Sequence, residues 1–229
     1  MYKAPKEYFI IKDYIDNEKM SLKDFLYFFF RIPKDLIEGL IRYLPGPVGI
    51  IIRRYYYKLI LKKVGKNVTI DEGVYFQGNN IEIDDWACID KFCVIRCYSR
   101  LRIGKRVHIG VSGIIHAGLN SEIIIDDNTA IADRCSFYSL TNAYAPNKRI
   151  GGPLCKSNEV ESRSGPILVS KDCFLGTGCL VLPNVKIGFG SIISAQAIIK
   201  KNIDELGIYD ENSKLIKKRD FNKNIFYDE

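Results

Sequence analysis

Hydrophobic residues recur every six positions between Val64 and Ile203, in eighteen units that each begin with an aliphatic or aromatic residue. This period fits neither an α-helix, with about 3.6 residues per turn, nor a lone strand, whose side chains alternate with a period of about two. The leading residues, grouped in threes, are Val64, Ile70, Phe76; Ile83, Ile89, Ile95; Ile103, Ile109, Ile115; Ile125, Ile131, Phe137; Val169, Leu175, Val181; and Ile187, Ile193, Ile199. Each group predicts one triangular coil of a parallel β-helix, with three short strands joined by tight corners.

The residue four places after each leading residue is usually small or apolar, which suits a corner inside a narrow prism. The leading residue is expected to point inward and to stack on its equivalents one coil above and below. Short insertions between groups, such as Asn80-Ile81-Glu82 and Arg100-Leu101-Arg102, are expected at corners. Stacked repeats bury a continuous core only when several neighbours are present. The sequence therefore predicts an all-β fold with a β-helix of about six coils.

A different pattern precedes the repeat. Two aromatic and aliphatic clusters, residues 25–30 and 55–61, flank the turn Leu44-Pro45-Gly46-Pro47 and predict two or three short helices. We therefore divide the chain into a helical N-terminal appendage (1–63), the β-helix (64–203) with an insertion loop (142–166), and a C-terminal tail (204–229). The longest uncharged run in the appendage, residues 43–52, is too short to span a bilayer.

The net charge of +7 is concentrated in the same appendage, because residues 20–66 hold ten Lys and Arg against three Asp and Glu. Two compatible interpretations follow. The helices can cap the open end of the prism, or residues 20–63 can lie on the cytoplasmic face of a membrane, where anionic lipids attract basic side chains. No groove-reading or base-stacking element accompanies the charge, so we expect no nucleic-acid partner.

The cysteines point to a reduced protein. Four of the seven, at positions 93, 135, 173 and 179, fall in the small inward corner slot, where a thiol acts as a compact hydrophobe. Cys88, Cys97 and Cys155 lack the paired spacing of metal ligands, so no metal is expected. The N-terminus shows no secretory signal. We expect a cytoplasmic protein, located at the inner membrane face if the appendage binds lipid.

The two ends of the repeat resemble a known family. Residues 49–55 followed by 63–68 are similar to the entry into the helix in bacterial polysaccharide and lipopolysaccharide O-acetyltransferases, and residues 198–203, 208–209 and 214–219 resemble their closing segment. Residues 210–213 read Asp-Glu-Asn-Ser, where the family usually has Gly-Asn-Pro-Ala. Over about residues 47–219 the chain thus resembles the hexapeptide-repeat acyltransferases of the left-handed β-helix class.

This resemblance implies a homotrimer with active sites between adjacent prisms and acetyl-CoA as the donor. It implies direct attack of an acceptor on the thioester, with a histidine as base and a backbone N–H that stabilises the oxyanion. We expect acetyl transfer to a sugar hydroxyl in surface polysaccharide synthesis. Two alternatives stay open: an N-acetyltransferase of a nucleotide-linked amino sugar, and a catalytically impaired or non-catalytic trimeric scaffold.

The catalytic base departs from the family pattern. The family's histidine ends the hexapeptide that precedes the insertion, and here that position holds Asn142, whose amide cannot accept a proton at neutral pH. His116 follows the leading residue Ile115 and should point outward toward the cleft. Three explanations remain: His116 has become the base, Asn142 marks a substituted variant, or activity has been lost. His108 is expected at the surface. The two histidines cannot supply the three ligands of a zinc carbonic anhydrase of this fold.

The resemblance also assigns donor and acceptor surfaces. The matching positions for the CoA arm are Gly176, Thr177, Gly178, Ser194, Ala195, Lys200 and Lys201. Small residues allow pantetheine to approach the backbone and lysines suit phosphates, although corner geometry alone also explains the glycines. The insertion loop supplies candidate acceptor contacts at Tyr144, Lys148, Arg149 and Arg163. A solvated loop would have the same composition.

Overall fold

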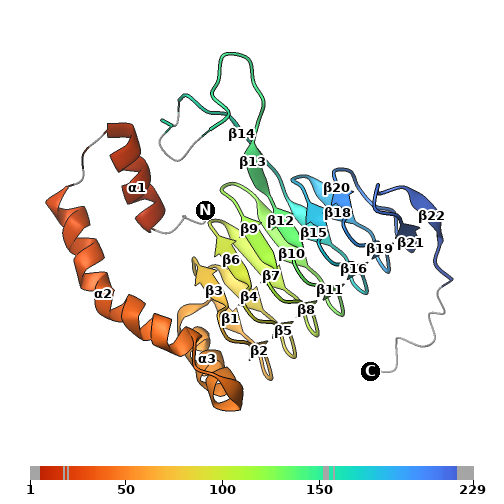
Figure 1. The fold of residues 1–229 in the computed structure, drawn as a ribbon, viewed down its shortest axis with the longest axis horizontal. Helices are drawn as coiled ribbons and strands as arrows, with labels where there is room; N and C mark the ends of the chain where they lie inside the picture. The colour runs from red at the N-terminus through yellow and green to blue at the C-terminus, as the bar shows by residue number, and fades with distance from the viewer. Residues whose placement is uncertain (1–5, 18, 20, 152–154, 157, 221–229) are drawn as a thin grey trace.

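The protein is a triangular β-helix with helices at its N-terminal end. A computed structural model describes residues 6–17, 19, 21–151, 155–156 and 158–220. Figure 1 shows the coils stacked side by side, with the helices at one end and the C-terminal strands at the other. The seven cysteines are all free thiols, and those at positions 93, 135, 173 and 179 are buried inside the prism as expected.

Three sheets form the sides of the prism. The first holds β1 (Lys63–Val64), β4 (Ile81–Ile83), β7 (Arg100–Ile103), β10 (Glu122–Ile125), β15 (Ile167–Val169) and β18 (Val185–Ile187). The second holds β2 (Thr69–Ile70), β5 (Cys88–Ile89), β8 (His108–Ile109), β11 (Ala130–Ile131), β16 (Phe174–Leu175), β19 (Ile192–Ile193), β21 (Gly207–Tyr209) and β22 (Leu215–Lys218). The third holds β3 (Tyr75–Gln77), β6 (Val94–Cys97), β9 (Ile114–Ala117), β12 (Ser136–Tyr138), β17 (Leu180–Val181) and β20 (Ile198–Ile199). Neighbouring coils pair in parallel, and the antiparallel pair β21–β22 closes the second sheet beside β19.

The predicted stacking is confirmed, because every leading residue is buried, with at most 6% of its surface exposed. The corner prediction fails at one corner only, between a third-sheet strand and the next coil. There Asn80, Ser99, Leu119 and Thr141 are only half-buried. The inserted residues Ile81, Leu101, Ile123 and Ile167 are fully buried and lie in register from coil to coil. The insertions therefore fill the core at this corner, and the residues expected there are displaced outward.

Three helices precede the coils: α1 (Lys6–Asn17), α2 (Leu22–Arg42) and α3 (Gly46–Ile60). Ser21 caps α2 by accepting a hydrogen bond from the Asp24 backbone N–H at 3.1 Å. Helix α3 packs on the first coil, where the Tyr57 ring lies 4.7 Å from that of Phe76. The fully buried Arg53 donates hydrogen bonds to the carbonyls of Ile70 (2.8 Å) and Leu44 (2.5 Å), which ties α3 to both the coil and the turn before it. None of the helices in the described residues has the length and apolar character needed to cross a membrane.

The insertion between Phe137 and Val169 folds into a hairpin that projects from the third sheet (Figure 1). Its base is the antiparallel pair β13 (Leu140–Asn142) and β14 (Ser162–Ser164), in which Asn142 lies opposite Ser162. A second bridge farther out joins Arg149 and Val160. The loop is therefore ordered by its own backbone pairing at the point where it leaves the prism.

Candidate active site

A column of polar side chains follows the outer face of the third sheet. The residue after each inward leading residue points outward, and the strand register aligns Gln77 with Arg96, Arg96 with His116, and His116 with Tyr138. Adjacent strands lie about 4.8 Å apart, so these side chains are neighbours. The phase of the repeat thus places His116 on the outside of the prism, as predicted from the sequence.

His116 lies in an aromatic environment and has a free ring nitrogen. Its ring packs edge-to-face between Tyr98, at a centroid distance of 5.4 Å, and Tyr138, at 5.9 Å. Its Nε2 atom is buried and has no hydrogen-bond partner within the described ranges. A buried polar atom without a partner is unusual and marks a place where a ligand can supply one.

The same surroundings keep this imidazole neutral. Burial lowers the pKa of His116, and the positive charge of Arg96 lowers this pKa further. No carboxylate bonds to the ring among the residues that the structure describes. A neutral imidazole with an unused lone pair has the form required of a general base near pH 7.

Ser139 fixes the strand end that carries His116. Its hydroxyl donates to the His116 carbonyl at 3.2 Å and accepts from the Gly118 N–H at 2.9 Å. The Ser121 hydroxyl lies 2.7 Å from it. The sequence analysis missed this network and the two tyrosines. Tyr138 could have been predicted, because it directly follows the leading residue Phe137 and must point outward. Tyr98 and Ser139 lie at irregular corners, where the repeat does not predict the direction of a side chain.

Asn142 holds the hairpin. Its side-chain amide donates to the Ile150 carbonyl at 2.6 Å, and it forms no hydrogen bond with His116 among the described residues. Gly151 has a positive φ of 105°, and a Cβ there would lie 2.4 Å from the Asn142 amide nitrogen. Asn142 and the bend at Gly151 therefore fit closely together, so the structure gives this asparagine a role in loop geometry.

The predicted acceptor residues divide into two pairs. Lys148 donates to the Asn158 carbonyl at 2.6 Å, and Arg149 lies 3.4 Å from the Glu159 carboxylate, so both brace the loop. Tyr144 is 90% exposed, and Arg163 lies exposed on β14. All four side chains are exposed, and those of Lys148 and Arg149 are in addition held by contacts within the loop.

The predicted donor residues also form two groups. Residues 176–178 lie against residues 194–196 of the next coil, where the Gln196 N–H donates to the Thr177 carbonyl at 2.8 Å. A Cβ on Gly176 would lie 2.5 Å from the Ala195 nitrogen, so coil packing alone requires this glycine. Lys200 and Lys201 are exposed beyond β20. Lys200 and Lys201 do not lie beside the first group. Lys200 comes directly after the inward-pointing Ile199, just as His116 comes directly after Ile115. Lys200 therefore lies on the same outer face of the third sheet as His116.

A second cluster lies on the outer face of the second sheet. Cys88 and His108 are cross-coil partners, and Asp90 joins them, with one ligand atom from each residue within 4.8 Å of the others. The Asp90 carboxylate lies 2.8 Å from His108 Nε2 and 3.4 Å from Cys88 Sγ. These residue types could hold a divalent cation such as zinc. The spacing along the chain could not reveal the cluster, because its members come from adjacent coils. Burial raises the pKa of the Cys88 thiol to about 12, so a metal would have to displace a proton.

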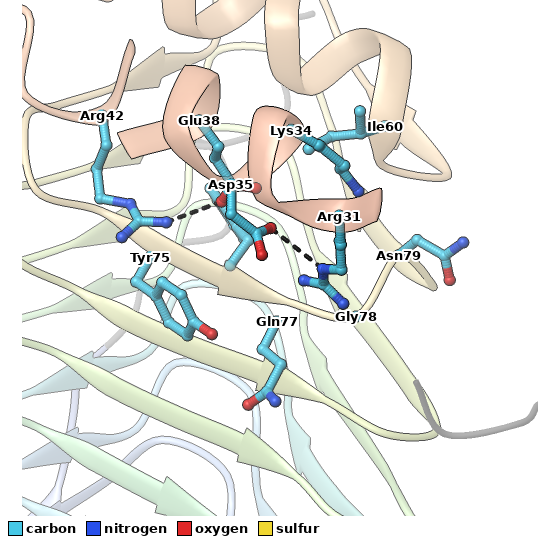
Figure 2. A pocket seen from close by; sticks show the side chains of 11 residues that line it. Arg31, Lys34, Asp35, Glu38, Arg42, Ile60, Tyr75, Gln77, Gly78 and Asn79 are labelled. Carbon is cyan, nitrogen blue, oxygen red and sulfur yellow. Dashed lines mark hydrogen bonds and ion pairs between the residues drawn. The ribbon is translucent and has the colours of Figure 1, made fainter. Parts of the chain in front are cut away.

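A cavity of about 470 Å³ lies between α2 and the first coil. Figure 2 shows its lining of charged side chains from α2 and of Tyr75, Gln77 and Asn79 from the coil. Gln77 also belongs to the column of His116, because the Tyr98 hydroxyl donates to its Oε1 at 3.1 Å. The cavity therefore adjoins one end of that column and does not surround His116.

Comparison with known proteins identifies relatives of this chain. Over 146 residues it is 33% identical to a dTDP-4-amino-4,6-dideoxy-D-glucose acyltransferase of Escherichia coli, a match that covers 62% of this chain and 74% of the relative. It is 26% identical over 102 residues to a galactoside O-acetyltransferase of Lactococcus lactis, covering 44% of this chain and 47% of that enzyme. No family model matches the sequence.

Solved structures agree with these relatives. The N-acyltransferase AntD of Bacillus cereus, in complex with dTDP-4-amino-4,6-dideoxyglucose and coenzyme A, superposes with a TM-score of 0.66 at 25% identity, covering 74% of this chain and 90% of AntD. A hexapeptide-repeat acetyltransferase of Vibrio cholerae shares the fold at 14% identity and a TM-score of 0.59, covering 83% of this chain and 91% of that structure.

The coils, the corner phase and these likenesses define a left-handed β-helix of the acyltransferase class. The chain belongs to the hexapeptide-repeat acyltransferases, the family of the Escherichia coli dTDP-amino-sugar enzyme.

Proposed function

We propose that this protein is an acyl-CoA-dependent N-acyltransferase that acts on a nucleotide-linked amino sugar. The observation that carries the proposal is the 33% identity to the Escherichia coli acyltransferase over most of that enzyme. The likeness to AntD with its bound dTDP-amino sugar and coenzyme A supports it. The expectation of a polysaccharide hydroxyl as acceptor thus gives way to the alternative left open by the sequence.

His116 is the base in this proposal. The sugar amine attacks the thioester carbonyl, a C–N bond forms, and His116 Nε2 takes the proton that the nitrogen must lose. The tetrahedral intermediate then collapses, the C–S bond breaks, and coenzyme A leaves with the electron pair. The unpartnered, half-buried ring and its lowered pKa support this role. A backbone N–H, expected from the family resemblance, stabilises the oxyanion.

The substrate surfaces follow the same face. We propose that the CoA arm lies along residues 176–178 and 194–195 and that Lys200 and Lys201 meet its phosphates. Tyr144 and Arg163 contact the acceptor, because both are exposed and neither takes part in the contacts that hold Lys148 and Arg149 within the loop. As the family resemblance implies, the functional unit is a homotrimer with sites between prisms. We place the reaction in the cytoplasm, where acyl-CoA thioesters are available.

The decisive experiment compares two matched acceptors. Purified protein is incubated with acetyl-CoA or 3-hydroxybutyryl-CoA and either dTDP-4-amino-4,6-dideoxyglucose or its 4-hydroxyl counterpart, and free CoA and the acylated sugar are measured by mass spectrometry. Product from the amine alone is expected. Product from the hydroxyl sugar alone would reverse the assignment, and no product with no CoA binding by calorimetry would favour the scaffold.

Transfer to a sugar hydroxyl is the second candidate, and the likeness to the galactoside O-acetyltransferase favours it. A β-galactoside and a surface-type oligosaccharide are therefore included as acceptors in the same assay. The same base chemistry applies, because a hydroxyl must lose its proton to attack the thioester. The acceptor alone distinguishes the two functions.

A further inference from the structure

Helix α2 has its apolar side turned away from the protein. Several of its large apolar side chains are between 49% and 74% exposed, namely those of Phe25, Phe29, Phe30, Ile32, Leu36, Ile37 and Leu40. A helix turns by about 100° per residue, so these positions fall within a sector of roughly 160°. No charged residue of α2 lies in that sector. A helix on a soluble protein normally buries such a face against the core.

The polar side of α2 faces the body instead. Figure 2 shows Arg31, Asp35, Glu38 and Arg42 on the side of the helix that overlooks β3. Glu38 is only 8% exposed and lies 2.9 Å from the Arg42 guanidinium, which stacks 4.7 Å from the centre of the Tyr75 ring. These contacts set the rotation of α2 about its axis and hold the apolar face outward.

Helix α3 has an exposed apolar side of its own. Val48, Ile51, Tyr55 and Leu59 are between 52% and 84% exposed and recur at helical spacing. They lie on the side of α3 opposite the buried Arg53 and Tyr57, which face the first coil. Large exposed apolar patches on soluble proteins mark interaction surfaces. Two consecutive helices thus each present an apolar stripe to the outside.

The charges beside this surface are basic. Lys23, Lys34 and Lys58 are exposed and form no ion pair among the residues that the structure describes. The acidic residues of α2, which are Asp24, Asp35 and Glu38, lie on its opposite side. A second copy of this chain would bring the same lysine-flanked surface against itself, with no carboxylate in it. Anionic lipid headgroups complement such lysines, and acyl chains accept the apolar side chains.

We propose that the exposed apolar surface of α2 and α3 docks on a bilayer that contains anionic lipids. The helices lie in the plane of the interface, since neither crosses it. The lysines meet the headgroups, and the aromatic and aliphatic side chains enter the acyl boundary. This inference does not depend on the acceptor or on the chemistry of His116.

Vesicle flotation tests the proposal with the full-length chain. The probes are vesicles of phosphatidylcholine with phosphatidylglycerol and vesicles of phosphatidylcholine alone. The native chain should float with the anionic vesicles and lose binding at high salt. The double variant Leu36→Glu and Leu40→Glu should bind the anionic vesicles at least about ten-fold more weakly. Each change removes apolar area that the membrane would bury. The matched control Leu215→Glu with Ile216→Glu alters two exposed residues on β22, far from the helices, and should bind as the native chain does.

Thermal unfolding and transfer to a soluble acceptor, measured on the same samples, show whether each variant is folded and active. If the protein did not acylate a nucleotide-linked amino sugar, its flotation with vesicles would be unchanged. The acyltransferase proposal and the membrane-docking proposal can therefore fail independently. Equal binding to both vesicle types, or binding retained by the double variant, overturns the docking proposal. Absent vesicle binding together with a smaller oligomer for the double variant, measured by light scattering, would instead make this surface a contact between copies.

Discussion

The two histidines of this protein lie on the same coil but on different sides of the prism. His108 is on β8 in the second sheet, its side chain is 50% exposed, and its Nε2 lies 2.8 Å from the Asp90 carboxylate. His116 is on β9 in the third sheet, half-buried between two tyrosine rings, with an unpartnered Nε2. The first nitrogen is already engaged by a carboxylate, whereas the second is buried and has no partner among the described residues.

This difference shows why residue type alone does not identify a base. A base needs a free lone pair, a pKa low enough that it is unprotonated before the reaction, and a position that a substrate can reach. Burial and Arg96 lower the pKa of His116, which satisfies the second condition. The outward phase of the third strand places the ring on the outer face of the prism, where the third condition requires the tyrosine rings to move aside, because Nε2 is buried between them. His108 belongs to a cluster with Cys88 and Asp90 whose residue types suit a metal ion, so its surroundings favour a different chemistry.

The largest expected effect comes from removing the free imidazole. His116→Asn should lower kcat by about 10²–10⁴-fold with little change in KM, because general base catalysis contributes on this scale. His108→Asn is the matched control and should keep kcat within about two-fold, because it alters a hydrogen bond to Asp90 on the other side of the prism. Steady-state release of CoA measures both variants. Equal losses of kcat in the two variants would show that His116 contributes no more to catalysis than His108 does.

A second substitution tests whether the base position expected from the family is active here. Asn142→His should not raise kcat, because the Asn142 side chain braces the hairpin through its hydrogen bond to the Ile150 carbonyl. It should lower the free energy of unfolding by about 1 kcal/mol through the lost hydrogen bond to Ile150. Asn142→Ala controls for that loss, and urea denaturation with CoA release reports both properties. A gain in kcat for Asn142→His alone would return the base to the hairpin.

The smallest effect concerns the His108 side. Asp90→Asn should change the free energy of unfolding by about 1 kcal/mol or less, because it alters a single hydrogen bond to the half-exposed His108. Urea denaturation with and without added zinc measures it. A zinc-dependent stabilisation of the native chain that this variant abolishes would show that Cys88, Asp90 and His108 act as a metal site.

The sequence predicted the prism better than the site. Inward leading residues repeat at a fixed spacing, so burial at Ile115 or Phe137 follows from local pattern alone. The corner at Asn80 was mispredicted because the inserted Ile81 competes for the same interior space, and only packing decides between them. His116 could be placed because its direction follows from the phase.

The rest of the site depends on contacts that the period does not encode. Asn142 bonds to a carbonyl in a loop that folds back on itself, and Ser139 links the next coil to Gly118 and Ser121 in the corner after β9. Tyr98 reaches His116 from an irregular corner one coil earlier. These contacts require the register between coils and the path of the insertion, neither of which one sequence supplies.

The central claim is that neutral His116 accepts the acceptor's proton, and its pH dependence tests this most directly. The measurement is kcat/KM of the native chain divided by that of His116→Asn at each pH, a ratio in which the titration of the acceptor amine cancels. Because the pKa of His116 is lowered from its ordinary 6.5, the ratio should fall at acidic pH as the imidazole becomes protonated, with the midpoint of the fall below pH 6.5. A ratio near one, or a large ratio that does not change with pH, would contradict the account.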